Sequence, residues 1–508
     1  MLPVVHRRAL RHARVRTPAP AVPHSAVRVA VKAFAMSARV VSLGAALAFA
    51  ACLAPATASA RILPGFIDMM TDSNRIVSRP STARPPYLSP VTEPTFGTQL
   101  TRIAGNTGTS IGGGMSGTWS SDVRHHYSKE QPWNADGSLM VIFNSGSGMM
   151  FLDGETYEPK FGRCSNYPQN DDRWHPSLAH KNERINVRGS QLIWHDVVNC
   201  VRTRQWTLPF SVNDFGPSEG NPSADGRFVA LTDGARMFVV DMDPQAPYEA
   251  YPSSRIGPSV RIDECGLSGG CRVDWVSVSA SGKYVVVSYD GDHPRVFDVN
   301  PATLALTPRA MPSGSPRCSG GAASKGYIYD VGHADMTLNP FDGNEDVIIG
   351  QEHCGNEGRT VGGQLMGGVT MVRLKDGAIT SLTDPEREDN PHHISTRNYD
   401  RPGWAYVGYR VDYSGKFTDE IISVKMDGSK TVQRFSHKHS AFESDYRSES
   451  HAVPSPDGRR VVFASNWTRN CVSCGSSSDI KAFVVDARSG VVVPDVIPPD
   501  AITDLETP

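Results

Sequence analysis

The sequence predicts an all-β fold, a β-propeller of about seven four-stranded blades, from three observations. The 508 residues include 46 Gly and 37 Pro, which favours many turns and few long helices. A phrase made of a small polar residue, a tight turn and an apolar strand-like run recurs along the chain. Its copies lie 43 to 60 residues apart, which is the spacing of propeller blades rather than of sandwich strands or helical repeats.

Residues 1–60 differ from the rest of the chain. An apolar run from Val40 to Leu53 follows a basic arm and ends at the small-residue sequence Ala58-Ser59-Ala60, which is typical of a secretory signal peptide and too short for a membrane span. We therefore predict a mis-called start at 1–35, a signal peptide at 36–60, no membrane span and a secreted or periplasmic bacterial protein. A lipid anchor at Cys52 is the alternative, because Phe49-Ala-Ala-Cys52 is similar to a lipobox but lacks the usual Leu.

The remaining eight cysteines are an even number, as disulfide pairing in an oxidising compartment requires. Two pairs enclose short polar loops and are predicted to staple them: Cys265 with Cys271, and Cys471 with Cys474. By elimination Cys164 with Cys200 and Cys318 with Cys354 are the longer-range pairs, although sequence alone does not fix connectivity. The Cys471-Val-Ser-Cys474 spacing leaves redox or zinc chemistry open as an alternative.

The repeated phrase gives seven register marks. Four copies carry an Asp-Gly turn or its Ser-Gly equivalent, which supplies the positive φ of a tight hairpin between two antiparallel strands. Three copies are looser. The marks are Asn134, Ser177, Ser223, Ser279, Asn339, Ser395 and Ser455.

The repeat sets the predicted domain limits. Residues 61–118 are a lead-in segment with a strand that closes the ring, residues 119–494 are the propeller, and residues 495–508 are a linker. That linker resembles the start of a fibronectin type III module. The repeated phrase itself resembles TolB-type, WD40-like propellers over residues 120–490, which implies the fold and says little about function.

Charge and motifs exclude several classes of function. The formal net charge is −2 and no basic stripe interleaved with aromatic residues occurs, so we expect no nucleic-acid partner. The sequence lacks a G-x-S-x-G nucleophile elbow, a P-loop and a dinucleotide fingerprint. Hydrolase, kinase and dehydrogenase activities are therefore not expected.

Histidines recur just ahead of several turn phrases, where the inner strands of a propeller line its central channel. Neutral imidazoles from several blades would suit Zn²⁺ or Mn²⁺. In the alternative interpretation Cys354 is disulfide-bonded and the histidines only bond the loops between blades. The predicted metal ligands are His333, His353, His392, His393 and His451.

A second set of residues fits proton abstraction from an acidic sugar. A lyase acting on a uronate polymer needs a cation for the carboxylate, a base for the C5 proton and an acid for the leaving oxygen. The candidate catalytic residues are His126, Tyr127, His175, Arg173 and Arg401.

The run from His125 to Gly137, with histidines in later inner strands, resembles propeller polysaccharide lyases of the oligogalacturonate and ulvan classes. The sequence departs from that pattern at Ser145-Gly146, where a second histidine is expected. We thus expect a secreted propeller that binds an extracellular ligand, a carbohydrate, at a His-rich channel mouth. The alternatives are a metal-containing lyase acting by β-elimination and a non-catalytic structural or interaction scaffold.

Overall fold

A computed structural model describes residues 65–168, 171–245, 255–263, 272–290, 292–318, 322–386, 391–411, 415–440, 446–472 and 474–489. The regular elements of this part are β-strands and one-turn 3₁₀ helices, so the predicted all-β class is confirmed. The predicted mis-called start, the signal peptide with Cys52 and the C-terminal linker from residue 495 lie outside the described residues, as does the Cys265–Cys271 pair.

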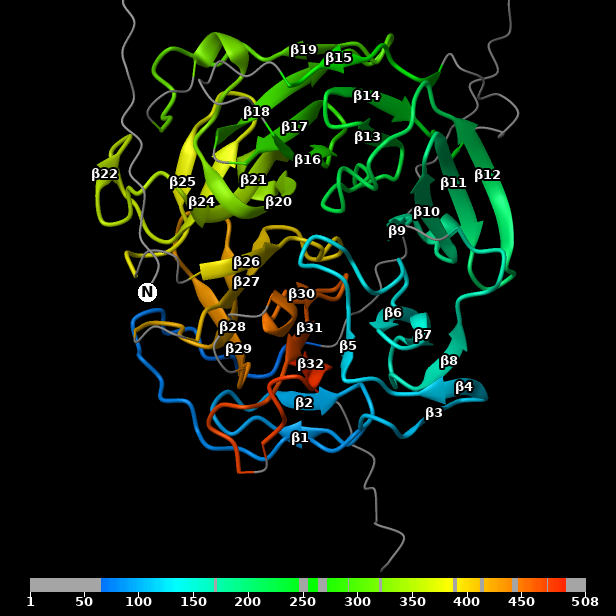
Figure 1. Ribbon diagram of the computed structural model, residues 1–508. Coiled ribbons are helices and arrows are strands. Elements are labelled where there is room, and N and C mark those ends of the chain that lie inside the picture. Colours follow the sequence, from blue (N-terminus) through cyan, green and yellow to red (C-terminus); the bar gives the residue numbers. More distant parts are fainter. Residues whose placement is uncertain are drawn as a thin grey trace, which may run out of the picture. The chain divides into compact units, whose positions relative to one another are not determined.

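Antiparallel sheets follow one another along the chain and surround a common centre in Figure 1, the arrangement of a β-propeller. In most of these sheets, strands that follow one another in the chain pair antiparallel, as in a meander. Five of these sheets contain three or four strands each. The first two consist of β9(Asp172–Trp174), β10(Glu183–Arg188), β11(Gln191–Asp196) and β12(Val201–Thr207), and of β13(Phe228–Thr232), β14(Arg236–Asp241) and β15(Val260–Arg261). The other three consist of β16(Val273–Val278), β17(Tyr284–Tyr289), β18(Asp292–Val299) and β19(Leu306–Pro308); of β20(Val331–Asn339), β21(Glu345–Glu352), β24(Val369–Arg373) and β25(Ile379–Ser381); and of β26(Pro391–Ser395), β27(Trp404–Tyr409), β28(Glu420–Lys425) and β29(Val432–His437).

A nine-stranded sheet contains both the first and the last strands of the repeat region. Its β32(Ile480–Asp486) pairs with β31, with the early strand β2, and in parallel with β5, where Ile480 lies opposite Asp122. An N-terminal strand therefore completes the last meander and shields its edge. The other strands are β5(Asp122–Arg124), β6(Leu139–Asn144), β7(Gly148–Asp153) and β8(Pro159–Gly162), then β30(Val453–Pro454), β31(Arg460–Ser465), β2(Gln99–Arg102) and β1(Val91–Thr92).

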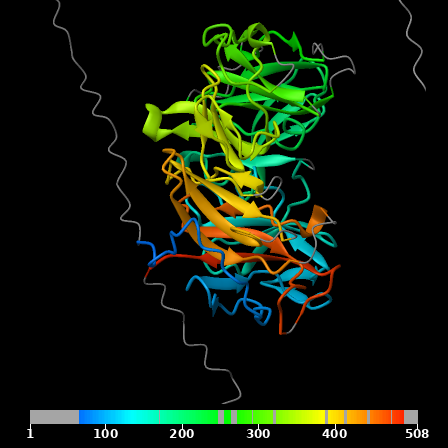
Figure 2. The same cartoon turned by 90° about the vertical axis from the view of Figure 1, so that its left-hand side faces the viewer.

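Two small hairpins stand apart from these sheets: β3(Ser110–Gly112) with β4(Met115–Thr118), and β22(Thr360–Val361) with β23(Gln364–Leu365). The segment before β1 runs alongside late strands, as the blue trace beside the orange strands in Figure 2 shows. Met70 forms a bridge with Arg434 of β29, and the buried Arg434 guanidinium donates to the carbonyl oxygens of Asp72 and Arg75 at 3.2 and 2.8 Å. This segment is thus fastened to the repeat region by backbone contacts.

The turns of the repeated phrase have the predicted backbone. Gly137, Gly226, Gly282 and Gly458 have φ between 68° and 78°. In each turn the glycine N–H donates to the register residue three positions earlier, at 2.8 to 3.0 Å. Two of the looser copies form 3₁₀ turns at the same place, η1(Leu178–His180) and η5(Pro340–Asp342), capped by the side chains of Ser177 and Asn339.

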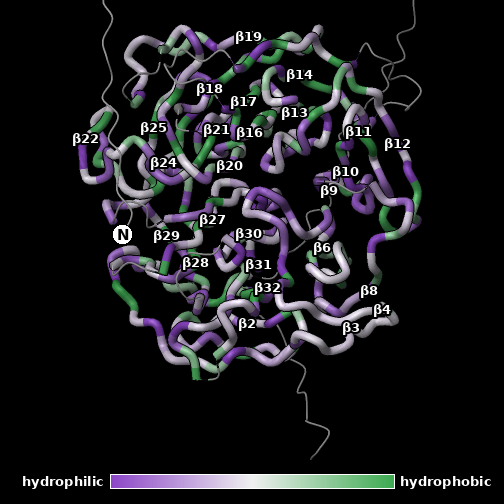
Figure 3. Tube along the Cα trace, viewed as in Figure 1, coloured by the Kyte–Doolittle hydropathy of each residue, from purple (hydrophilic) through white to green (hydrophobic). Residues whose placement is uncertain are grey.

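The core consists of apolar clusters between successive sheets. One cluster joins β21 and β24 to β26, β27 and β28 through residues such as Ile349, Ile394 and Ile422. Strand centres are correspondingly apolar along the trace in Figure 3. Alternate side chains of a strand face opposite sides of its sheet, and both sides are covered here, so the strands are apolar runs and not alternating patterns.

Three disulfides lie within the described residues and match predicted pairs: Cys164–Cys200, Cys318–Cys354 and Cys471–Cys474, with Cα atoms 6.2, 5.4 and 5.2 Å apart. They are consistent with an oxidising compartment. No helix within the described ranges is long and apolar enough to cross a membrane.

Gly226 offers a test of this turn geometry. A Cβ at this residue would overlap the ring of His175, and its φ of +74° disfavours any side chain; Gly108 has a φ of +84° but no atom within 4 Å of such a Cβ. Both Gly→Ala changes cost about 1–2 kcal/mol of backbone strain. We expect Gly226→Ala to cost about 1–3 kcal/mol more, from overpacking, in the free energy of unfolding measured with urea.

The double variant Gly226→Ala with His175→Ala should recover part of that extra loss. Equal losses for Gly226→Ala and Gly108→Ala would contradict the packing of His175 against this turn.

Candidate metal centre

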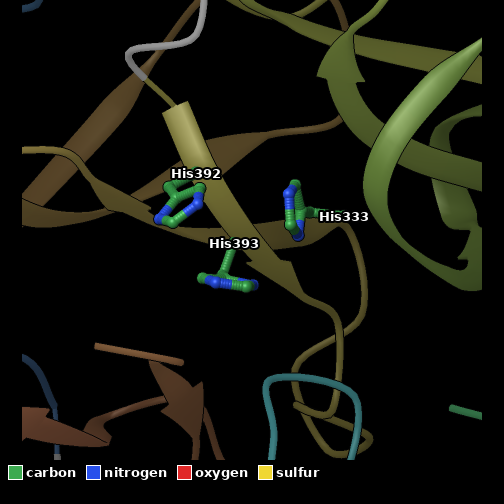
Figure 4. Close-up of side chains that lie close together, drawn as sticks. All are labelled: His333, His392 and His393. Carbon is green, nitrogen blue, oxygen red and sulfur yellow. The ribbon is translucent and has the colours of Figure 1, made fainter. Parts of the chain in front are cut away.

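Histidines from neighbouring sheets gather at one end of the inner strands. His333 comes from β20, His392 and His393 come from β26, and Figure 4 shows their three rings facing one another. One ligand atom from each lies within 4.8 Å of the others. His451, just before β30, extends the group, because its ring centroid lies 4.2 Å from that of His393.

Irregularities in strands β20 and β26 determine the direction of the histidine side chains. The register of β20 with β21 shifts between Gly332 and Asp335, and that of β26 with β27 shifts between Pro391 and His393. In a regular strand two successive residues face opposite sides, whereas a bulge redirects one of them. The bulge therefore allows His392 and His393 to lie together, with ring centroids 4.3 Å apart.

Two of the four histidines have left-handed backbones. His333 has a φ of 45° and His451 has a φ of 44°. Such a conformation costs a non-glycine residue about 1–2 kcal/mol and is concentrated at functional sites. The surrounding strands keep His333 and His451 in this strained conformation.

Burial keeps three of the four rings uncharged. It lowers the pKa of His333, His393 and His451 well below the usual value, and the neighbouring imidazoles act in the same direction. Neutral imidazole is the form that binds a metal ion. The cluster therefore presents lone pairs and not positive charges at neutral pH.

Second contacts fix the tautomers of two rings. The Nε2 of His393 lies 2.8 Å from a carboxylate oxygen of Glu449, and that of His451 lies 3.2 Å from the carbonyl oxygen of Tyr446. Because these oxygens only accept, Nε2 donates in both rings and the lone pair is on Nδ1. Neither Nδ1 has a hydrogen-bond partner among the described atoms.

A carboxylate that orients a histidine is the usual second contact of a metal ligand. The donor set therefore fits a borderline cation such as Zn²⁺ or Mn²⁺. His392 differs, because Arg410 donates to its Nε2 at 3.1 Å, and metal binding at that nitrogen would displace this contact.

Two residues of the first inner strand reach the cluster. His125 is 1% exposed, and its Nε2 donates to the carbonyl oxygen of His451 at 2.5 Å. Tyr127 packs its ring against His393 and His451 at 5.3 and 4.9 Å, and its hydroxyl lies 3.4 Å from Nδ1 of His333. Burial and nearby Glu219 raise the pKa of Tyr127 well above its usual value, so the hydroxyl stays protonated.

Three predicted residues lie elsewhere. His353 is exposed beside Gly332 and is absent from the groups of converging ligand atoms within the described chain. His175 follows β9 at the turn end of that strand and contacts His180 and Trp194, while Arg401 stacks on Phe66 and Trp404. For His175 and Arg401 the reason is the direction of the inner strands: residues at their start collect at the histidine end, and those adjoining the turns lie at the other. His353 instead follows β21 at the histidine end, but it does not converge with the other ligand atoms.

His126 and Arg173 belong to a buried ionic network beside the cluster. The Nδ1 of His126 lies 2.8 Å from Glu130, and Arg173 lies 2.6 Å from Asp171 and 3.7 Å from Glu130. Arg184 binds Glu130 from the other side at 2.7 Å. His126, Glu130 and Asp171 could together hold a cation. Arg173 and Arg184 already neutralise the carboxylates of Asp171 and Glu130, however, so these residues form a network of ion pairs.

A cavity of about 160 Å³ is lined by residues of β16 and β20, among them Ala334, which follows His333. It has room for about five water molecules at about 30 Å³ each. Lys129 lines it, with its ammonium 2.5 Å from Glu219 and 3.9 Å from the centroid of the Trp275 ring. Asp335 and Arg397, which form two hydrogen bonds of 2.7 and 2.9 Å, line it farther along.

Sequence reasoning did not find Lys129, Glu130, Glu449 or Tyr446. The only signal for Glu449 was its position two residues before His451, which puts both on one face of an extended segment. Lys129 and Glu130 come two and three residues after Tyr127, but no pattern distinguishes them from surface residues.

No protein-family model matches this chain, and no curated protein matches it. Among solved structures, an oligogalacturonate lyase in complex with manganese is 12% identical with a TM-score of 0.46, and covers 84% of this chain and 98% of its own. An oligogalacturonate lyase from Vibrio parahaemolyticus is 10% identical with a TM-score of 0.48, covering 84% and 99%. A β-propeller domain from Myceliophteria thermophila is 10% identical with a TM-score of 0.37, covering 70% and 96%.

Both kinds of propeller that the sequence resembles, the WD40 type and the polysaccharide-lyase type, are thus among the similar structures. At these identities they say nothing about which residues act.

The His126–Glu130 pair predicts a pH dependence of stability. Burial acts to lower the pKa of His126, but the hydrogen bond and charge of Glu130 outweigh it and raise the pKa above 6.5. The pair therefore stabilises the fold fully below about pH 6.5 and loses this contribution as the pH rises through the raised pKa. Because the ring is 35% exposed, solvent screening limits the effect to at most about 1 kcal/mol.

Urea unfolding of the wild type and His126→Gln at pH 6 and pH 9 measures this contribution. The stability advantage of the wild type should shrink between the two pH values. An advantage that is constant or grows with pH would show that His126 is not held protonated.

Proposed function

We propose that this protein is an exported, metal-binding propeller that acts on a uronate-containing polysaccharide by β-elimination. The gathering of four histidines, three of them buried, at one end of the inner strands carries the proposal, since two of them hold strained backbones and two present an unpaired Nδ1. Histidines with a purely structural role would not need neutral rings whose Nδ1 atoms lack hydrogen-bond partners. Binding of an extracellular carbohydrate at this end is the simpler form of the same proposal.

We further propose that the fold has seven blades. The nine-stranded sheet divides at the parallel contact between β32 and β5 into two meanders, one at each end of the repeat region. With the other five sheets they make seven units, in agreement with the seven register marks of the sequence.

His333, His392 and His393, whose ligand atoms lie within 4.8 Å of one another, would hold the metal once His392 exchanges its Arg410 contact. A bound Zn²⁺ or Mn²⁺ would withdraw charge from the uronate carboxylate and make the neighbouring C5 proton more acidic. His126, whose ring is one-third exposed and whose pKa is raised, would add positive charge for an anionic substrate.

Side chains of the cluster have the protonation states that elimination needs. The neutral His451, which does not ligate the metal, accepts the C5 proton. The electron pair forms the C4–C5 double bond, the C4–oxygen bond breaks, and the protonated Tyr127 hydroxyl donates to the leaving oxygen. The ionic network of Arg173, Glu130 and Asp171 keeps His126 charged, while His175 and Arg401 stabilise other parts of the fold.

The test combines elemental analysis of the purified mature protein with an absorbance assay for unsaturated uronate ends. Pectic, alginate and ulvan-type polymers serve as substrates. We expect about one equivalent of metal per chain and rising absorbance on one of these polymers. His393→Ala should lose both metal and activity, because it removes the central ligand.

Tyr127→Phe should keep the metal and lower the rate by about 100-fold or more, since it removes only the proton donor. The exposed His353→Ala is the matched control and should keep both properties. Metal without activity on any uronate polymer would contradict the lyase and leave a metal-containing binding propeller. Absence of metal in the wild type would contradict the metal centre.

A further inference from the structure

We infer that Tyr446 and Arg447 form a subsite for a second uronate residue of the substrate chain, next to the histidine cluster. The inference rests on the proposed function, which it deepens by requiring a substrate of at least two sugar units. The two residues belong to the single turn η6(Tyr446–Ser448).

The Tyr446 ring packs against the cluster. Its centroid lies 4.8 Å from that of His451 and 6.3 Å from that of Tyr127, to which it is nearly parallel, with an angle of 20° between the planes. The Arg124 guanidinium lies 5.6 Å from the ring centroid. Despite these contacts 52% of Tyr446 is exposed, so an apolar ring surface faces solvent beside the site.

Exposed large apolar side chains are common when scattered singly. Tyr446 differs from the other examples in the described chain, because its ring contacts both His451 and Tyr127. Phe341 provides a comparison: it is 49% exposed but belongs to η5, which follows the far end of β20, away from the end that carries His333.

Charged side chains of both signs border the ring. Arg447 has 41% of its side chain exposed, with its Nε 2.5 Å from Asp122, and the buried Arg124 lies 4.0 Å from the same carboxylate. The charges of Glu219 and Glu449 also act on Tyr446. An aromatic face suits the C–H side of a sugar ring, and an exposed guanidinium suits its carboxylate, so the pair matches a uronate.

Binding measurements in a Tyr127→Phe background test this subsite, because the phenyl ring preserves the packing on Tyr446 while turnover is blocked. We would measure dissociation constants for a uronate monosaccharide and for its tetramer. Tyr446→Ala should weaken binding of the tetramer by about 5- to 10-fold, the loss of one aromatic contact. Binding of the monosaccharide should change less than about 2-fold, and Tyr446→Phe should bind the tetramer as tightly as its parent.

Arg447→Gln should also weaken tetramer binding and flatten its dependence on salt, since an exposed charge pair is screened. Phe341→Ala is the matched control, with no expected change. Equal tetramer affinity in Tyr446→Ala and its parent would overturn the subsite while leaving the proposed function intact. Absence of binding by any uronate in the parent would overturn the proposed function and the subsite together.

Discussion

The pairing of β32 with β2 and with β5 is the constraint on which the site depends. It joins the last sheet to the first, so that residues more than 300 positions apart in sequence become neighbours. The short hydrogen bond from His125 to the carbonyl oxygen of His451 lies across this junction. Tyr127 from the first sheet and His451 from the last therefore meet at the cluster, which β20 and β26 complete from later sheets.

Burial has opposite consequences in the two polar groups at this end of the strands. In the histidine cluster, burial and the neighbouring imidazoles outweigh the Glu449 carboxylate beside His393, and the pKa values of three rings are lowered. In the adjoining network Glu130 contacts His126 directly, and its charge outweighs burial. One group of residues thus presents neutral rings, and the other favours a protonated ring.

Sequence reasoning predicted the repeat, its hairpin turns and three of the disulfides, because each depends on local pattern. Asp-Gly turns need a positive φ that glycine adopts freely, and Gly137, Gly226 and Gly458 have it. The histidines His333, His392, His393 and His451 could be singled out because they recur at the start of inner strands. His175 and Arg401 were grouped with them, since the sequence does not show which end of a strand faces the site.

The sequence by itself determined an all-β chain with a blade-length repeat, its turns and its supply of histidines, since these follow from short-range spacing and backbone preference. Only the tertiary structure decided which histidines converge. That outcome depends on two bulges, on left-handed backbones at His333 and His451, and on pairing between the two ends of the repeat region. Such features arise from contacts between sheets, and side chains like Glu449 and Tyr446 acquire their roles through proximity in space.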